Sequence, residues 1–280
     1  MSRHAIYPDL KDKIVLITGI GQNGDPAMWG NGAATTRTFV RNGSKVFGCD
    51  LNISTAQATR TRLLSEFPKA SIEVIEADVT KANQVKSLVD ACLKKFGRID
   101  ILVNNVGRSE KGDPASMSEE VWDAQMDVNL KSVYLSCHFV LPIMERQNSG
   151  VIINISSIAG LKYIGKPQVA YAATKAALIN FARVTAVTYA PNNIRLNTVV
   201  PGLINTPLVK GLADKYAGGD YEGFVKQRNG QVPTGNMGSS DDVANAVVFL
   251  SSDSAKYITG TKLVVDGAIT GSTGRTDFKL

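Results

Sequence analysis

Short apolar runs recur along the chain, and the spacing between them leaves room for one helix at a time. The first run ends at Gly19 and is continuous rather than alternating, which is typical of a strand buried on both faces of a sheet. This pattern predicts strands at residues 13–18, 45–50, 72–77, 99–103, 151–155, 194–200 and 263–265. The intervening segments have helical periodicity and predict helices at roughly 32–42, 54–67, 82–96, 119–145, 169–190 and 240–251.

Strands that alternate with helices pair in parallel through right-handed crossovers. We therefore expect an α/β fold, a doubly wound parallel seven-stranded sheet with helices on both faces. No repeat or low-complexity linker divides the chain, so residues 1–280 are interpreted as one domain. Within it we expect a leader at 1–11, a substrate lid at about 203–230 and a C-terminal tail at 269–280.

Composition narrows the class of protein further. With 44% hydrophobic and 20% charged residues, the chain has the balance of an ordinary globular domain. Its net charge of +6 is spread along the sequence, which argues against a nucleic-acid partner. No apolar stretch is long enough for a signal peptide or a membrane span, so we expect no membrane partner. Cys49, Cys92 and Cys137 lack metal-like spacing and favour a cytoplasmic location, and with only His4 and His138 present we expect no metal site.

The glycines after the first predicted strand indicate a phosphate-binding turn. Backbone amides at glycines and at a helix N-terminus can approach a pyrophosphate closely. Residues 19–24 nominally match Gly-x-Gly-x-x-Gly, but an Asp-Pro pair follows at once and the helical pattern begins later. We therefore assign the phosphate contact to Gly19, Gly30 and Gly32, with residues 20–29 as an enlarged loop.

Polar residues follow the next three strands, where ligands of such sheets bind. Asp50 ends the second strand, where a carboxylate can accept both ribose hydroxyls of an adenosine. Asp78 and Val79 end the third strand beside the expected adenine, and residues 104–107 (Asn-Asn-Val-Gly) end the fourth. Each could be a turn residue alone, but together they favour a dinucleotide site.

A serine, a tyrosine and a lysine supply candidate catalytic chemistry. Tyr171 and Lys175 are four residues apart, so on a helix they share one face, and Ser157 follows the fifth strand. A cation near a phenol favours the phenolate, and such a phenol can exchange a proton with an alcohol or carbonyl oxygen. The spacing alone is a weak signal, because Tyr7 and Lys11 repeat it without a preceding strand.

These motifs together resemble the short-chain dehydrogenase/reductase family, in its single-domain branch with a Rossmann fold. Residues 104–107 resemble its Asn-Asn-Ala-Gly motif, and Asn129, Ser157, Tyr171 and Lys175 match its catalytic tetrad. The glycine motif fits only with extra residues in the loop. The resemblance covers nearly the whole chain.

The resemblance implies a role for each tetrad residue. Tyr171 is expected to be the general acid/base, and Ser157 to polarise the substrate oxygen. Lys175 is expected to hold the nicotinamide ribose and to lower the pKa of Tyr171, while Asn129 supports a proton path through water. The expected cofactor-binding residues are Gly19, Gly30, Asn31, Gly32, Asp50, Leu51, Asp78, Val79, Asn105, Val106, Gly107, Tyr171, Lys175, Pro201, Gly202, Ile204 and Thr206.

The leading hypothesis is an NAD-dependent oxidoreductase of secondary alcohols and ketones. NAD is preferred over NADP because Asp50 would repel a 2′-phosphate and no arginine follows it at 51–53. The alternatives are an NADPH-dependent β-ketoacyl thioester reductase and a non-catalytic dinucleotide-binding scaffold. An enoyl reductase is disfavoured, because its lysine would stand farther from the tyrosine.

The substrate site and the oligomeric state are predicted in outline. We expect the substrate to be framed by Arg108 and Ser109, by residues 158–164 and by a mainly apolar lid at 203–228. Arg108 and Lys162 are candidates for an acidic substrate group, although solvated surface charge is the simpler interpretation. A homotetramer is expected from the apolar residues on the helices near 119–145 and 169–190: Val133, Leu135, Phe139, Val140, Leu178, Phe181 and Val184.

Overall fold

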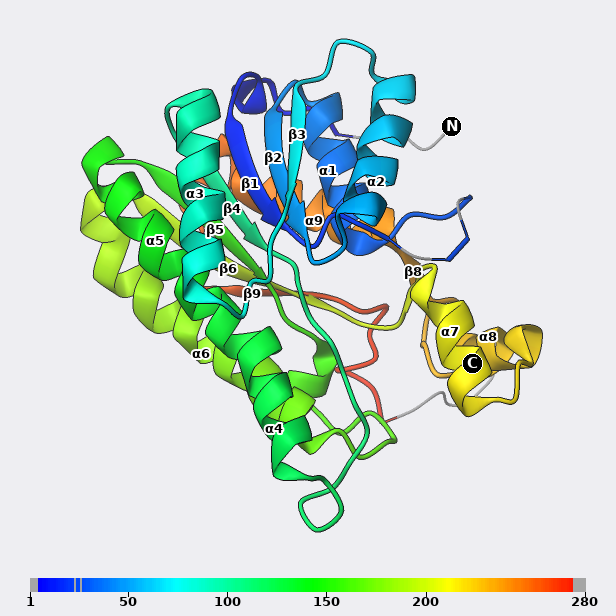
Figure 1. Cartoon of the computed structure of the whole chain (residues 1–280). Coiled ribbons are helices and arrows are strands. Elements are labelled where there is room, and N and C mark those ends of the chain that lie inside the picture. The colour runs from blue at the N-terminus through cyan, green and yellow to red at the C-terminus, as the bar shows by residue number, and fades with distance from the viewer. Residues whose placement is uncertain (1–4, 23, 26, 274–280) are drawn as a thin grey trace.

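The computed structural model of the chain describes residues 5–22, 24–25 and 27–273. Its centre is a parallel sheet of seven strands in the order β3-β2-β1-β4-β5-β6-β9 (Figure 1). The strands are β1 (Ile14–Thr18), β2 (Lys45–Asp50), β3 (Ile72–Glu76), β4 (Ile101–Asn104), β5 (Gly150–Ile155), β6 (Ile194–Pro201) and β9 (Lys262–Val265). From β1 the chain adds β2 and β3 on one side and then β4, β5, β6 and β9 on the other side. The ligand crevice expected at this switch in strand order lies at the carboxyl ends of β1 and β4. The predicted fold is confirmed.

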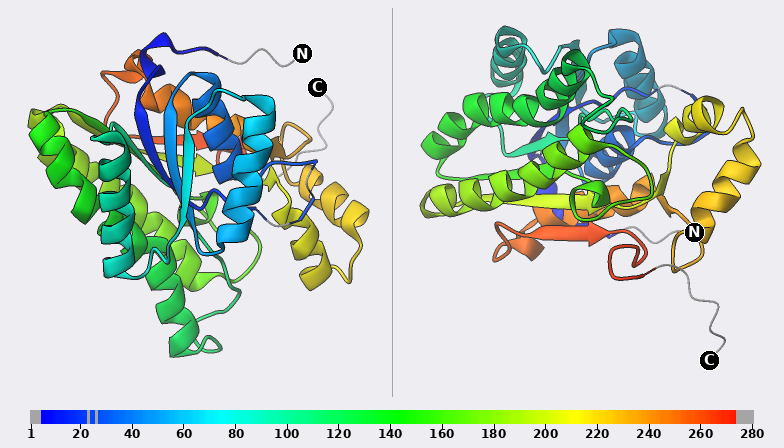
Figure 2. Two further views of the ribbon diagram at one scale, coloured as in Figure 1. Left: turned by 45° about the horizontal axis from the view of Figure 1, so that its top comes forward. Right: turned by 90° about the horizontal axis from the view of Figure 1, so that it is seen from below.

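Helices cover both faces of this sheet (Figures 1 and 2). One face carries α1 (Asn31–Arg41), α2 (Ile53–Glu66) and α9 (Ser240–Ser251), and the other carries α3 (Ala82–Phe96), α5 (Ser132–Gln147) and α6 (Val169–Tyr189). A shorter helix, α4 (Glu119–Met126), precedes α5. Within the described residues, no helix is long and apolar enough to cross a membrane.

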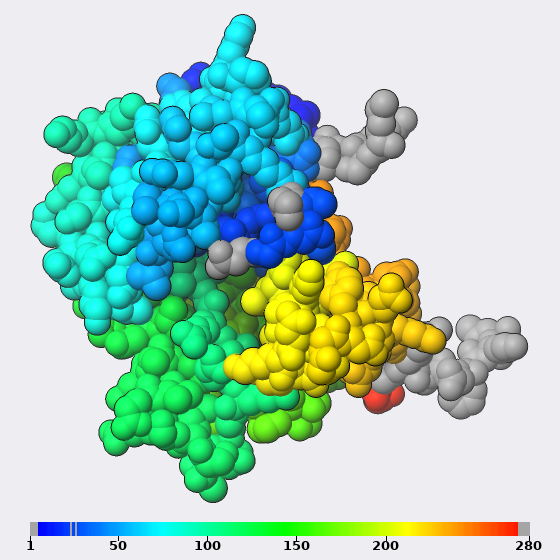
Figure 3. Space-filling view, turned by 45° about the vertical axis from the view of Figure 1, so that its right-hand side comes forward, coloured from blue at the N-terminus to red at the C-terminus, as the bar shows by residue number. Residues whose placement is uncertain are grey.

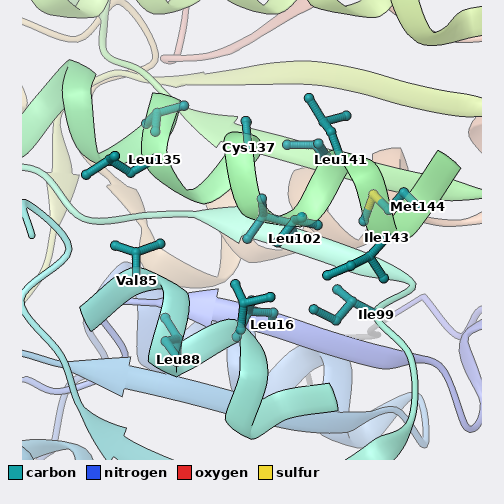
Figure 4. Close-up of a cluster of buried hydrophobic side chains, with 14 of the residues drawn as sticks. Leu16, Val85, Leu88, Ile99, Leu102, Leu135, Cys137, Leu141, Ile143 and Met144 are labelled. Atoms are coloured by element: carbon teal, nitrogen blue, oxygen red, sulfur yellow. The ribbon is translucent and has the colours of Figure 1, made fainter. Parts of the chain in front are cut away.

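Successive strand residues supply two separate cores. On β1, Leu16 packs toward α3 and α5, while its neighbours Val15 and Ile17 pack toward α1 and α9. Figure 4 shows Leu16 and Leu102 facing the side chains of α3 and α5 in the first of these cores. Because both faces of each central strand are buried, the strands read as continuous apolar runs in the sequence.

The helix predicted at 119–145 is interrupted. A π-helical turn, Asp127–Lys131, separates α4 from α5, and Asn129 lies within it. Periodicity could not predict this turn, because one extra residue per turn barely changes an apolar pattern.

The lid segment contains structure that the sequence interpretation did not assign. It forms α7 (Leu208–Tyr216) and α8 (Tyr221–Gly230), with a two-stranded parallel pair of β7 (Ile204–Asn205) and β8 (Gly238–Ser239) at its base. In Figure 1 the two helices stand apart from the sheet, at its carboxyl end. The expected leader and tail fall partly on residues 1–4 and 274–280, outside the described part of the chain.

Candidate active site

Two adjoining hollows lie beyond the carboxyl ends of the strands. One is lined by Gly19, Cys49, Asp50, Leu51, Ala77, Asp78, Val79, Thr80, Asn105, Val106, Gly107 and Val128. The other, of about 230 Å³, contains Asn31, Ser157, Tyr171, Lys175, Pro201, Gly202, Ile204 and Thr206 in its wall. Asn105 and Gly107 line both, so an extended ligand can run from one to the other. Figure 3 shows the surface hollowed between the blue and cyan half, the yellow lid helices and the green helices.

The structure brings Ser157, Tyr171 and Lys175 into one wall. Helix α6 presents Tyr171 and Lys175 from adjacent turns, and Lys175 Nζ lies 5.6 Å from the centre of the Tyr171 ring. Ser157 follows β5 and is hydrogen-bonded through its side chain to Tyr171. The helix is fixed against the strand end because Ser156 Oγ donates to the Lys175 carbonyl at 2.7 Å.

Burial governs the protonation of both groups on α6. It raises the pKa of the Tyr171 phenol, and the hydrogen bond to Ser157 partly offsets that rise. Burial lowers the pKa of the Lys175 ammonium to about 8. The direction for Tyr171 is opposite to the lowering that the family resemblance implies. Lys175 Nζ donates to the Ile155 carbonyl at 2.9 Å.

Asn129 does not reach the hollow. It is fully buried, and the π-helical turn directs its amide at the main chain after β4. Asn129 Oδ1 accepts from the Arg108 amide at 2.9 Å, and Nδ2 donates to the Arg108 carbonyl at 2.8 Å. A Cβ on Gly107 would stand 3.1 Å from Asn129 Oδ1 and 3.0 Å from Lys175 Nζ. Asn129 therefore positions the backbone that passes beside Lys175.

The glycine turn is as tight as a pyrophosphate site requires. A Cβ on Gly32 would lie 2.0 Å from the Gly19 carbonyl oxygen, so the first turn of α1 accommodates only glycine at position 32. Gly30 is the N-cap of α1, but its amide donates to Gln22 Oε1 at 2.8 Å. A phosphate could use that amide only if Gln22 moved.

The enlarged loop is attached at both sides of the turn. Arg62 donates to the Met28 carbonyl at 2.7 Å and stacks on Trp29, with its guanidinium carbon 3.3 Å from the ring centre. The Gly21 amide donates to Asp50 Oδ2 at 2.9 Å, and the Asn52 amide donates to Oδ1 at 3.2 Å. Asp50 is thus oriented at the rim of the first hollow.

The substrate side of the second hollow differs from expectation. Ser109, Ile158, Ile164, Leu208, Val209 and Leu212 line it as expected for 108–109, 158–164 and the apolar lid. Arg108 instead pairs with Glu110 at 3.0 Å, and Lys162 donates to the carbonyls of Ile269 and Ser272. Neither is in the wall. Two other cations, Lys166 and Arg228, do line the second hollow.

Sequence reasoning did not identify Lys166, and it included Arg228 only as the last residue of the apolar lid at 203–228, because nothing in their spacing relates the two cations. Lys166 lies in the loop before α6, and Arg228 lies on α8, a helix that was not predicted. They meet only through the fold of the lid.

Known proteins share this architecture over almost the whole chain. The family model described as enoyl-(acyl carrier protein) reductase matches residues 27–270. The chain is 36% identical to 3beta-hydroxysteroid dehydrogenase 1 of Eggerthella lenta over 95% of its length and 96% of that protein. It is 34% identical to a 3-oxoacyl-[acyl-carrier-protein] reductase of Thermotoga maritima, over 93% and 98% of the two chains.

A solved structure from Burkholderia xenovorans, described as a short-chain dehydrogenase/reductase, superposes with a TM-score of 0.89. Its sequence is 40% identical, and the match covers 94% of this chain and 98% of that one. The resemblance seen in the motifs is confirmed. The chain belongs to the short-chain dehydrogenase/reductase family, whose members are nicotinamide-dependent oxidoreductases of alcohol and ketone groups.

Proposed function

We propose that the protein is an NAD-dependent oxidoreductase that interconverts a secondary alcohol and a ketone, with Tyr171 as general acid/base. The observation that carries this proposal is the shared wall of Ser157, Tyr171 and Lys175, beside a hollow that contains Asp50. The tight Gly19–Gly32 turn and the continuity of the two hollows fit a dinucleotide. When bound, the nicotinamide supplies or accepts the hydride.

The side chains of this protein donate and accept the proton of the reaction. Because burial raises the pKa of Tyr171, the phenol is protonated at neutral pH and ready to donate to a ketone oxygen. Ser157, hydrogen-bonded to the phenol, is placed to hold the same oxygen. Lys175 holds its ammonium beside this pair and, by the family resemblance, binds the nicotinamide ribose. Asn129 acts through the backbone at Arg108.

The preference for NAD rests on Asp50. The described residues that line its hollow include no lysine or arginine to receive a 2′-phosphate. Two arginines of the neighbouring helices α1 and α2 are engaged elsewhere, since Arg37 pairs with Glu66 at 2.7 Å and Arg62 stacks on Trp29. Two unit charges about 4 Å apart repel by roughly 4 kcal/mol at an effective dielectric near 20. A preference for NAD of about tenfold or more is therefore expected.

The test is kcat/KM with NADH and NADPH for the wild type and Asp50→Ala. We expect the wild type to favour NADH and the variant to lose most of that preference. Asp90→Ala removes a carboxylate from the exposed side of α3 and serves as the control. Equal efficiency with both cofactors in the wild type would refute the role of Asp50.

The second candidate is a β-ketoacyl thioester reductase that uses NADPH. The 34% identical Thermotoga maritima relative, named a 3-oxoacyl-[acyl-carrier-protein] reductase, favours it. A panel of simple ketones and acetoacetyl-CoA, followed by the absorbance of NADH and NADPH, separates the two. A scaffold would bind cofactor without turnover on any of them.

The three cysteines are buried and free, which supports a cytoplasmic location.

A further inference from the structure

The second hollow contains two cations that the reaction of Tyr171 does not use. Lys166 reaches it from the loop before α6, and Arg228 reaches it from α8 in the lid. Each is half-buried. They approach from different elements, so their meeting is a property of the folded site.

Neither cation has an acidic partner among the described residues. Within the described part of the chain, Lys166 Nζ makes no hydrogen bond and no ion pair. Arg228 Nε donates to Met237 Sδ at 3.3 Å, and its guanidinium carbon stands 5.4 Å from the centre of the Phe224 ring. Neither contact neutralises charge. None of the described residues that line the hollow is an aspartate or a glutamate.

Other cations near the site have hydrogen-bonding partners. Arg108 and Lys215 both pair with Glu110, at 3.0 and 2.9 Å. Lys162 donates to two main-chain carbonyls. Among the cations that line the second hollow, Lys175 donates to the Ile155 carbonyl, whereas Lys166 and Arg228 have neither an acidic nor a carbonyl partner among the described residues.

The unpaired charges disfavour the empty site. Burial lowers the pKa of the Lys166 ammonium, and repulsion from Arg228 and then from Lys111 lowers it further. Burial also lowers the pKa of Arg228. A buried charge is costly unless it is paired. An anion between the two side chains would remove both the repulsion and the missing pairing.

We propose that the substrate carries an anionic oxygen group, such as a carboxylate, phosphonate or sulfonate, which Lys166 and Arg228 bind while Tyr171 and Ser157 hold its keto or hydroxyl oxygen. This inference rests on the proposed oxidoreductase function. A guanidinium and an ammonium on opposite elements can share the oxygens of one such group. The apolar residues Leu208, Val209 and Leu212 then enclose the carbon chain between the two ends.

The experiment compares keto acids with their neutral esters. The probes are levulinate against methyl levulinate, acetoacetate against methyl acetoacetate, and acetonylphosphonate against its dimethyl ester. We expect kcat/KM to favour the anionic member of at least one pair by about tenfold or more, the size expected for hydrogen bonds to a charged group. The pair with the largest ratio identifies the head group and the spacing.

Charge-removing variants assign the effect to the two residues. Arg228→Gln and Lys166→Gln should each lower the anion-to-ester ratio by about tenfold, mainly by raising KM for the anion. Lys226→Gln removes the same charge from the exposed side of α8 and should leave the ratio as in the wild type. The Kd of NADH, followed by its fluorescence, tests whether the cations bind the cofactor instead.

The outcomes separate this inference from the function beneath it. If no ketone of any charge is turned over, the oxidoreductase function fails. If esters are reduced as well as or better than every matched anion, the function stands and the anion site is refuted. It is also refuted if Arg228→Gln weakens NADH binding as much as it lowers the ratio, because the guanidinium would then serve the cofactor phosphates.

Discussion

At the scale of single residues, the phenol of Tyr171 is the proposed general acid/base. Tyr171→Phe keeps the ring but removes the exchangeable proton, so kcat should fall by about 10²–10⁴-fold while the Kd of NADH changes little. Tyr189→Phe, on the same helix, is the matched control. Because the pKa of Tyr171 is raised, the phenolate becomes populated only at alkaline pH, and alcohol oxidation in the wild type should accelerate as pH rises. A variant with more than half the wild-type activity would contradict this role.

Lys175 should leave a signature in the pH dependence of stability. It is 2% exposed, and burial holds the pKa of its ammonium at about 8 against 10.5 for an ordinary lysine. Between these values the unfolded chain binds a proton that the folded chain does not, so the free energy of unfolding rises with pH.

Relative to Lys175→Met, wild-type stability should therefore increase by about 2–3 kcal/mol between about pH 7 and pH 10. Urea denaturation of both proteins at the two pH values measures this difference. If the free energy of unfolding of the wild type minus that of Lys175→Met stays constant or falls as pH rises, the pKa of the ammonium is not lowered by burial.

Spacing in the sequence was enough to find some site residues and not others. Tyr171 and Lys175 are recognisable because a helix places residues four apart on one face. Asp50 is recognisable because it ends a buried strand. Lys166 and Arg228 have no such local relation, since their meeting depends on how the lid folds back over the hollow. Pairs of this kind, which are distant in the sequence, can be identified only from the folded structure.

At the scale of elements, the strands and most helices follow from apolar periodicity, and the exceptions have physical causes. The π-helical turn at Asp127–Lys131 adds one residue that no pattern records, yet it is what turns Asn129 toward the backbone of Arg108. Helix α8 has no fully buried residue, so it lacks the apolar stripe by which a helix is recognised.

The junction of β1 and α1 gives a prediction at this scale. In Gly32→Ala the new Cβ would clash with the Gly19 carbonyl oxygen, 2.0 Å away in the present geometry. The turn must open, which should destabilise the protein by about 1–3 kcal/mol and weaken NADH binding. Gly30→Ala is the control for stability, because its Cβ would meet nothing nearer than the Gln22 side chain at 3.6 Å. Equal Tm values for the two variants would contradict the tight packing.

At the scale of the whole molecule, α5 and α6 lie side by side on one outer face, on the left in Figures 1 and 2. Four of the residues that suggested assembly are buried within the subunit and offer no exposed surface to a second copy: Val133, Leu135, Val140 and Leu178. Val184 is 58% exposed, and the same face adds Val187 at 73% and Tyr134 at 50%. The expectation of a homotetramer therefore depends on a smaller apolar surface than the sequence suggested.

This surface makes the assembly testable. Burying Val184 and Val187 against a second copy removes apolar area from water, whereas glutamates there would place like charges at the two-fold axis. Light scattering of the wild type should give about four times the chain mass of 30.0 kDa, and Val184→Glu with Val187→Glu should lower that mass. Leu51→Glu adds a charge at a similarly exposed apolar residue that follows β2, outside α5 and α6, and should leave the mass unchanged. A wild type that scatters as a monomer at micromolar concentration would refute the assembly, and an unchanged mass in the double variant would move the interface away from α6.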